Sequence, residues 1–329
     1  MLKLDFINVG NGDSMLIREM EGTRQRFAML VDCGHDNLVR DDHPPLSDQS
    51  SRRIYAGDFL RKQGVEKLDL LLLTHFHRDH IGGLGRILEA VEVEQLAATY
   101  VPPAGAPPLE PDRDLTLHKT ARNLLRCLEI YAAALREHPG RVKHVTVLPG
   151  TEQMTLQLTE DLSMDILFGD PFLYKRQRQV YDAAFAGERE CYPLMKWSKM
   201  MNVSSLRQRL HYKGRDVVLG GDTYAHLWEA DTLAPCEVLK VPHHASLSST
   251  TRKLIAQLRP QTAVVCVASE RPDERPHPYI VSLLQEMVPP VYFTDAVHLP
   301  GLVAPAYHEH GNGRPDWTPG PRVDEAQVC

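Results

Sequence analysis

The stretch that decides the fold is Leu68-Asp69-Leu70-Leu71-Leu72-Leu73-Thr74-His75-Phe76-His77-Arg78-Asp79-His80. Its first half is an almost entirely apolar run of strand length, which predicts a buried strand. Its second half holds three histidines and one aspartate within six residues, followed by Ile81-Gly82-Gly83 and a helical pattern from Leu84 to Val93. In α/β proteins, functional side chains lie on the turns after the carboxyl ends of buried strands. The stretch therefore predicts a site as well as a fold.

The polar side chains of this turn have the chemistry of metal ligands. Residues two apart in an extended turn point the same way, so His75 and His77 can share one metal ion, while Asp79 and His80 face a second position. Imidazole and carboxylate ligands without thiolate suit zinc, manganese or iron and leave coordination positions open for water. The alternative, a solvated histidine-rich loop, accounts for one or two histidines but not for four ligands at this spacing.

Further motifs stand before and after this cluster in a fixed order. They are Phe6 to Ser14, Val31 to Gly34, Asn202 to Leu206, Asp216 to Asp222, Leu239 to Ser246, His277-Pro278 and Phe293 to Asp295. In this order the chain resembles the metallo-β-lactamase superfamily of binuclear hydrolases, and within it the C-terminal hydrolase domain of ComEC-type competence (DNA-uptake) proteins. The resemblance implies an α/β fold, the αββα sandwich, in which two β-sheets lie between helical layers and the metals lie at one edge.

The resemblance also implies metal ligands outside the cluster. Asp222 would bridge the two metals, although a Gly-Asp pair after a strand is often only a turn cap. His243 would be the last ligand, beside Asp79 and His80. Asn202 stands where the wider superfamily has a histidine. Because an amide oxygen is a weaker ligand than imidazole, this departure predicts a loosely held first metal, manganese-like rather than zinc.

Residues around these ligands are expected to act on the substrate or to orient the metals. Lys240, His244 and His277 are the candidates to hold a phosphate group, and Asp79 is assigned to catalysis as well as to metal binding. Lys240 is equally well explained as a strand-end surface lysine, and His277 as a loop residue. Two adjacent histidines are barely separable by sequence. Asp13 and Asp32 would accept hydrogen bonds from ligating histidines, or serve only as turn residues. Ala245 stands where the family usually has glycine.

The predicted function is hydrolysis of a phosphodiester bond, in DNA or another nucleotide, by a hydroxide that bridges two divalent metal ions, zinc or manganese in preference to iron. The same metals could serve a small phosphoester such as a phosphocholine or cyclic nucleotide, a lactone or a thioester. A di-iron redox protein would need a further ligand where Asn202 stands. A non-catalytic partner subunit is disfavoured by the full ligand complement.

Composition fits a globular protein without excluding these functions. The 329 residues are 43% hydrophobic and 24% charged, which is ordinary for a globular chain. The net charge of −6 gives no overall basic field, which counts weakly against a nuclease. The six cysteines form no CxxC pair and are expected to be reduced thiols. Without a signal peptide or an apolar stretch of membrane-span length, a cytoplasmic protein with no membrane partner is expected.

Alternating strands and helices predict one domain over residues 1–310, with insertions at about 102–142 and 171–200 and a disordered tail at 311–329. A mobile loop is expected at 34–52. In the second insertion, Tyr174 to Lys199 interleaves basic and aromatic residues, which suits an anionic substrate that can stack, or else forms a solvated face. Strands are expected at 3–9, 14–18, 26–31, 68–73, 97–101, 155–158, 163–168, 205–210, 217–219, 238–241, 262–267 and 291–294, and helices at 53–63, 84–93, 115–137, 250–257 and 280–287.

Overall fold

The computed structural model describes residues 1–39, 53–113, 116–150, 153–228, 233–268, 274–288 and 290–295. The predicted tail at 311–329, and most of the loop predicted at 34–52, lie outside the described residues. Among the described helices, none combines the length and the apolar composition needed to cross a bilayer.

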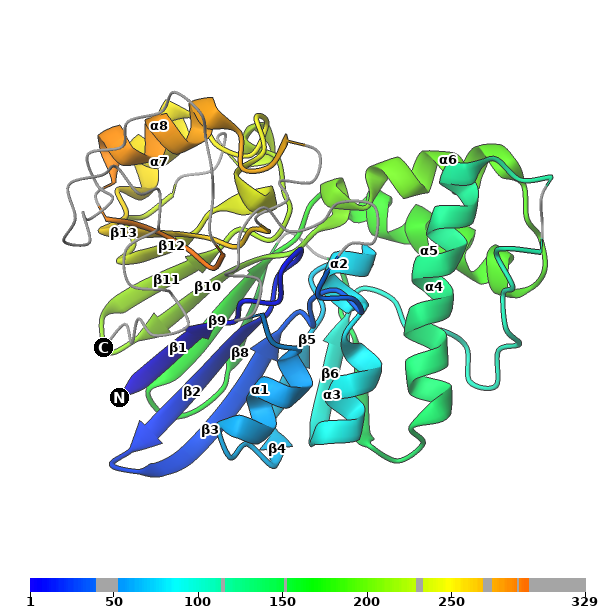
Figure 1. The fold of residues 1–329 in the computed structure, drawn as a ribbon, viewed down its shortest axis with the longest axis horizontal. Coiled ribbons are helices and arrows are strands. Elements are labelled where there is room, and N and C mark those ends of the chain that lie inside the picture. Colours follow the sequence, from blue (N-terminus) through cyan, green and yellow to red (C-terminus); the bar gives the residue numbers. More distant parts are fainter. Residues whose placement is uncertain are drawn as a thin grey trace.

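The described strands form two sheets that face each other (Figure 1). The first has the order β1-β2-β3-β5-β6-β4, with β7 also paired to β6, and the second has the order β14-β13-β12-β11-β10-β9-β8. The first sheet contains β1 (Leu2–Phe6), β2 (Met15–Glu21), β3 (Arg24–Val31), β4 (Lys67–Leu68), β5 (Leu70–Leu72), β6 (Glu92–Ala98) and β7 (Val142–Val147). The second contains β8 (Gln153–Gln157), β9 (Leu162–Leu167), β10 (Arg207–Tyr212), β11 (Arg215–Leu219), β12 (Val238–Lys240), β13 (Thr262–Val265) and β14 (Val291–Phe293).

Helices cover the outer face of each sheet (Figure 1). On the first sheet lie α1 (Ala56–Lys62), α2 (Arg78–Ile81), α3 (Leu84–Ala90) and α4 (Lys119–Glu137), with α5 (Pro171–Phe185) and α6 (Cys191–Met200) beside α4. On the second sheet lie α7 (Arg252–Leu258) and α8 (Pro278–Met287). One buried cluster fills the space between the first sheet and its helices. A second lies between the two sheets, and a third lies between the second sheet and its helices. This arrangement is the predicted αββα sandwich.

The leucine run shows why this sequence gives these layers. Along β5, Leu71 packs toward the helices, and Leu70 and Leu72 pack toward the second sheet. Side chains on a strand alternate between its two faces, so a strand covered on both faces must be apolar throughout. The apolar run is therefore the expected pattern for a central strand of a sandwich with helices outside.

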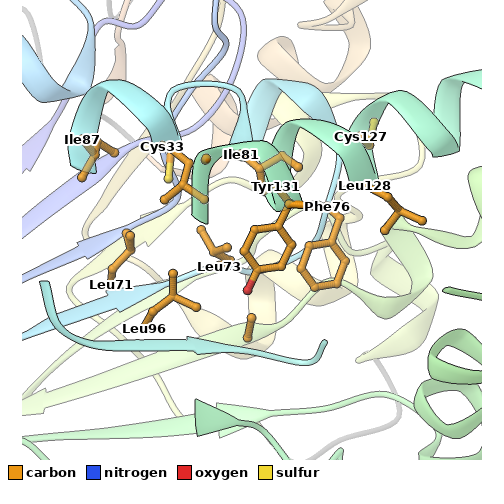
Figure 2. Packing of buried hydrophobic residues seen from close by; sticks show 14 of the residues in the cluster. Cys33, Leu71, Leu73, Phe76, Ile81, Ile87, Leu96, Cys127, Leu128 and Tyr131 are labelled. Carbon is orange, nitrogen blue, oxygen red and sulfur yellow. The ribbon is translucent and has the colours of Figure 1, made fainter. Parts of the chain in front are cut away.

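The core also holds the ligand-bearing turn in place. Phe76 stands between the first two histidines of the motif and is fully buried. Its ring stacks on Tyr131 of α4, with centroids 5.4 Å apart, and meets Tyr181 of α5 edge to face at 5.9 Å. Figure 2 shows Phe76 and Tyr131 side by side, close to Leu73. Alternation thus sends the phenylalanine into the core, which leaves the flanking histidines on the opposite side.

The sequence predictions of individual elements were wrong at three places. The helix predicted to reach Val93 ends at Ala90, and the next strand covers residues 92–98 rather than 97–101. Strand β7 was not predicted, because it is an exposed edge strand of mixed polarity. Helices α5 and α6 lie in the predicted insertion at 171–200, where no helix was predicted from the sequence. Asp170 caps α5 just before a proline, a helix-start signal that was overlooked.

Candidate metal centre

The candidate ligands come from three turns at the carboxyl ends of neighbouring strands. His75 and His77 follow β5, and the short helix α2 then presents Asp79 and His80. Asp222 follows β11. Strand β12 runs parallel to β11, so the histidine pair after β12 reaches the same edge of its sheet. Because the two sheets face each other, the turns at the carboxyl ends of β5, β11 and β12 lie close together at one edge of the sandwich.

Two groups of ligand side chains form where the turns meet. His75, His77 and Asp222 define position A, and Asp79, His80, Asp222 and His244 define position B. Within each group, one ligand atom of every residue lies within 4.8 Å of the others. Asp222 belongs to both groups, as the predicted bridging role requires.

The distances show how closely the side chains converge. At position A, His75 Nε2 lies 2.9 Å from His77 Nδ1. At position B, His244 Nε2 lies 3.3 Å from Asp79 Oδ2 and 3.6 Å from Asp222 Oδ2. His80 Nε2 lies 3.4 Å from Asp222 Oδ2. Nitrogen and oxygen lone pairs thus point at common positions, an arrangement that suits a metal with nitrogen and oxygen ligands.

Unpaired buried atoms support a metal at these positions. His80 Nε2, His244 Nε2 and Asp222 Oδ1 are buried and have no hydrogen-bond partner within the described part of the chain. Leaving such an atom unsatisfied costs about 1–3 kcal/mol. The two histidine nitrogens lie 3.4 and 3.6 Å from Asp222 Oδ2, and this convergence indicates that a ligand completes their bonding. The residues present therefore fit two divalent ions.

Outer hydrogen bonds turn the ring nitrogens in the required direction. Asp32 Oδ2 accepts from His80 Nδ1 at 2.8 Å and from the Thr74 hydroxyl at 2.7 Å. The same hydroxyl lies 3.1 Å from His75 Nδ1 and can accept its N–H. Since each Nδ1 is occupied, each Nε2 keeps a lone pair for a metal. Asp32 thus occupies the predicted outer position.

In the metal-free centre, neighbouring charges shift the pKa values of His80 and Asp222 in opposite directions. Burial opposes the charged form of His80, but the carboxylates of Asp222 and Asp32 outweigh it and raise its pKa well above the usual range. Burial likewise opposes ionisation of Asp222, and the surrounding imidazoles of His244, His80 and His243 nevertheless hold its pKa well below the usual range. A metal at position B must therefore displace a proton from His80.

The structure reverses the predicted roles of the adjacent histidines. His244, not His243, points into position B, because its Nδ1 donates to the Cys266 carbonyl at 2.9 Å and its Nε2 faces Asp79. His243 Nε2 instead accepts from Asn202 Nδ2 at 3.0 Å. The sequence had suggested His243 as the last ligand of position B and His244 as a substrate contact. The side-chain positions favour the exchange of these roles, with His243 Nε2 3.8 Å from Asp222 Oδ2 but outside the ligand group of position B.

The backbone of this turn explains why sequence could not separate the two histidines. His243, His244 and Ala245 all have positive φ, at 47°, 51° and 56°. A run of left-handed residues changes which side chain points inward. Such a conformation costs a non-glycine residue roughly 1–2 kcal/mol. The usual family glycine at position 245 is therefore explained by a positive φ that alanine adopts here with strain.

Lys240 does not hold substrate. It is fully buried, and its ammonium donates to the Asp13 carboxylate and, at 3.1 Å, to the Gly221 carbonyl. Burial alone would lower its pKa, but Asp13 and Asp222 raise it, so Lys240 remains charged. Both sequence interpretations, a phosphate contact and a surface lysine, are therefore wrong. Lys240 is an internal cation behind Asp222, and Asp13 is its partner.

Of the two remaining predicted site residues, Asn202 lines the cavity over the metal positions and His277 does not. His277 caps α8 by accepting from the Tyr279 N–H at 3.3 Å, and its own N–H donates to the Ala245 carbonyl at 2.9 Å. It does not line the cavity over the metal positions, so its predicted phosphate contact is corrected to an anchoring role. Asn202 lines this cavity, and its Oδ1 is buried without a hydrogen-bond partner in the described residues. Coordination by Asn202 remains a prediction.

The position of Gly12 shows why the motif from Phe6 to Ser14 requires a glycine next to Asp13. Gly12 has φ 125°, and a Cβ there would lie 1.9 Å from the Asp79 carbonyl oxygen. The next residue, Asp13, donates its N–H to the same oxygen at 3.2 Å. The Gly10-to-Asp13 turn therefore packs directly against the backbone of a metal ligand, an approach that only glycine allows.

A cavity of about 1160 Å³ opens over the two positions. Every described lining residue except Leu247 carries a polar or charged group. The lining consists of Asn11, His35, Asn37, His77, Arg78, Asp79, Asn123, Asn202, Tyr224, His243, Ser246, Leu247, Ser248 and Arg275. Asn123, Tyr224 and Arg275 were not predicted. Tyr224 could have been suspected two residues after Asp222, whereas nothing in the sequence around Arg275 or Asn123 signals their position.

The segment predicted to bind substrate, Tyr174 to Lys199, does not line this cavity. Tyr174 and Tyr181 are buried in the core and unavailable for stacking. Arg178 donates to the backbone carbonyls of Thr99 and Leu148. The neighbouring basic residues Lys175 and Arg176 are exposed. The predicted role of the aromatic residues is therefore wrong for the two buried tyrosines.

Comparison with known proteins agrees with this geometry. Residues 7–161 match the model of the Metallo-beta-lactamase superfamily. Over this range, which includes the histidine cluster, the chain is similar to a metallo-β-lactamase superfamily domain. Over 292 residues it is 28% identical to ComE operon protein 3 of Bacillus subtilis (strain 168), which covers 86% of this chain. The chain spans only 30% of that relative's length.

Two of the solved structures of similar fold cover most of this chain. The metallo-beta-lactamase fold protein YhfI from Bacillus subtilis is 12% identical, with a TM-score of 0.45 over 91% of this chain and 98% of its own. Zn(2+)-bound PqqB from Methylobacterium extorquens is 12% identical, with a TM-score of 0.39 over 85% of this chain and 84% of its own.

The ligand sets predict unequal metal affinities. Position B has two imidazoles and two carboxylates, and position A has two imidazoles and the shared carboxylate. We expect two divalent ions per chain after loading. During dialysis against a weak chelator, the ion at position A should be lost before the ion at position B. Because a proton on His80 competes with the metal, affinity at position B should fall as the pH falls. Elemental analysis of the dialysed protein at two pH values measures both effects. Simultaneous loss of both ions would contradict the unequal sites.

Proposed function

We propose that this chain is a metallo-β-lactamase superfamily hydrolase, a phosphodiesterase that acts on DNA or another nucleotide. The observation that carries the proposal is the cavity over positions A and B, which is large, open and polar. Leu247 is the single aliphatic side chain among its described lining residues. Sites for apolar ligands are lined predominantly by hydrophobic and aromatic groups, so an ionic and hydrophilic substrate fits this cavity better than an acyl lactone or thioester.

Different residues of the chain would bind the metal ions and orient the substrate. His75, His77, Asp79, His80, Asp222 and His244 would hold the ions. Divalent ions at these two positions would supply Lewis-acid activation of water and of the phosphoryl group. His243, Asn202 and Tyr224 lie together at the wall of the cavity, with Asn202 Nδ2 3.5 Å from the Tyr224 hydroxyl. These side chains can orient a substrate by hydrogen bonds while the metal ligands stay buried.

The resemblance to the hydrolase domain of ComEC-type competence proteins supports a nucleic-acid substrate, whereas the acidic net charge of −6 supports a small phosphoester. A polynucleotide and a small phosphoester differ in how many phosphate groups the protein must bind. A polynucleotide needs basic groups beyond the metals, and the exposed pair Lys175 and Arg176 on α5 provides candidates. A cyclic nucleotide or phosphocholine would need only the cavity.

The proposed function predicts a specific pattern of activity. The metal-loaded protein should hydrolyse bis(p-nitrophenyl) phosphate and single-stranded DNA, and should cleave a γ-lactone far more slowly. Comparison of Mn²⁺ with Zn²⁺, using metal-stripped protein as the blank, measures dependence on the ions. A protein that cuts the lactone but no phosphodiester with either metal would overturn the proposal.

A charge-reversal variant separates the two substrate classes within this experiment. Lys175→Glu with Arg176→Glu should weaken DNA cleavage and reduce its salt dependence by roughly one unit of slope per lost phosphate contact. Cleavage of bis(p-nitrophenyl) phosphate should stay unchanged, because both residues lie outside the metal cavity. If the variant cuts DNA as well as the parent does, the polynucleotide does not contact this face of α5.

A further inference from the structure

Two arginines, Arg78 and Arg275, line the metal cavity. Arg78 begins α2, between the ligands His77 and Asp79. Its Nε and Nη2 donate to the two oxygens of Asp36, at 2.7 and 2.8 Å. This paired, two-fold contact balances its charge and fixes its orientation. Arg78 is therefore committed to holding the loop that carries Asp36.

Arg275 reaches the cavity from the other end of the chain. It precedes α8, and it lines the cavity together with His77 and His243. His77 belongs to position A, and His243 stands next to the ligand His244, so the three residues lie where a substrate would approach the metals.

The backbone around Arg275 is attached to the turn that presents the metal ligand. His277 donates its N–H to the Ala245 carbonyl at 2.9 Å, next to His244. Pro276 is buried, and the His277 side chain caps α8. The backbone two residues after Arg275 is thus tied to the turn that carries His244.

We propose that Arg275 binds the anionic group of the substrate in the metal cavity and so determines a preference for anionic over neutral esters. The inference rests on the proposed function in taking this group to be a phosphate. A guanidinium is planar, carries its charge at every physiological pH and presents N–H donors spaced to match two oxygens of a phosphate. Arg275 would hold non-bridging oxygens, while the buried ligands hold the ions.

This role predicts a loss of binding rather than a loss of chemistry. With bis(p-nitrophenyl) phosphate, Arg275→Gln should raise KM about 10- to 100-fold, the value of a charge-assisted contact, with a smaller change in kcat. Arg275→Lys keeps the charge without the two-fold geometry, and its KM should lie between the two. Hydrolysis of the neutral ester p-nitrophenyl acetate should be unchanged in both variants.

A binding measurement keeps this inference separate from the proposed function. Calorimetric titration of the metal-loaded protein with inorganic phosphate should show about 10-fold or greater weakening in Arg275→Gln. Arg252→Gln is the matched control, because Arg252 pairs with Glu286 on the surface, away from the cavity. If phosphate binding weakens but no phosphodiester is cleaved, the proposed function fails and the anion site stands. If phosphate binding and KM match those of the parent in a folded Arg275→Gln protein, Arg275 does not contact the anion.

Discussion

Replacement of His244 by alanine is expected to remove one metal ion and to lower phosphodiesterase activity by more than about 100-fold. Loss of an outer-shell partner alone costs 10- to 100-fold in metal affinity or activity, and His244 lies in the inner group, with Nε2 3.3 Å from Asp79 and 3.6 Å from Asp222. Elemental analysis of the purified variant gives the metal content, and bis(p-nitrophenyl) phosphate gives the rate.

The neighbouring residue provides the control for this prediction. His243→Ala should retain both ions, because His243 hydrogen-bonds to Asn202 and Ser246 and belongs to neither ligand group. Its activity should fall less than that of His244→Ala, through loss of a cavity wall. Two-metal content in His244→Ala, with one-metal content in His243→Ala, would restore the roles that the sequence alone had suggested.

Local sequence patterns located most of the site because its ligands follow apolar strands. The leucine run of β5 and its histidine cluster occupy one continuous stretch, so period and spacing specify both the strand and four ligands. The four ligands of this stretch needed no knowledge of how distant segments pack. The role of Asp222, at the carboxyl end of β11, was implied only by the family resemblance, because a Gly-Asp pair after a strand can equally be a turn cap.

Properties that arise from tertiary contacts could not be predicted in this way. The orientation of the histidine pair depends on three consecutive residues of positive φ, for which non-glycine residues give no signal. The burial of Lys240 depends on Asp13, which is 227 residues away in the chain. Arg275 lines the cavity from a segment whose His277 N–H donates to the carbonyl of Ala245. In each case the informative partner lies far away in sequence.

The internal ion pair gives the largest expected effect on stability. Asp13 and Lys240 are both fully buried, and Lys240 also lies 4.0 Å from Asp222. Removing one partner of a buried pair leaves the other charge uncompensated, which costs about 3–5 kcal/mol. Replacing both partners by neutral groups costs much less, because no charge stays buried. The pair should therefore behave as a unit.

Lys240→Met should accordingly lower the free energy of unfolding of the metal-free protein by about 3–5 kcal/mol, seen as an earlier urea midpoint. Lys240→Met combined with Asp13→Asn should recover much of that loss, although each substitution alone destabilises. The surface control is Lys213→Met, whose ammonium pairs with Asp161 at 2.8 Å but is 57% exposed, so little change is expected. If Lys240→Met unfolds at the same urea concentration as Lys213→Met, the ammonium contributes nothing to stability. If the double variant is instead as unstable as the sum of its parts, the two residues act independently and Lys240 serves Asp222 rather than Asp13.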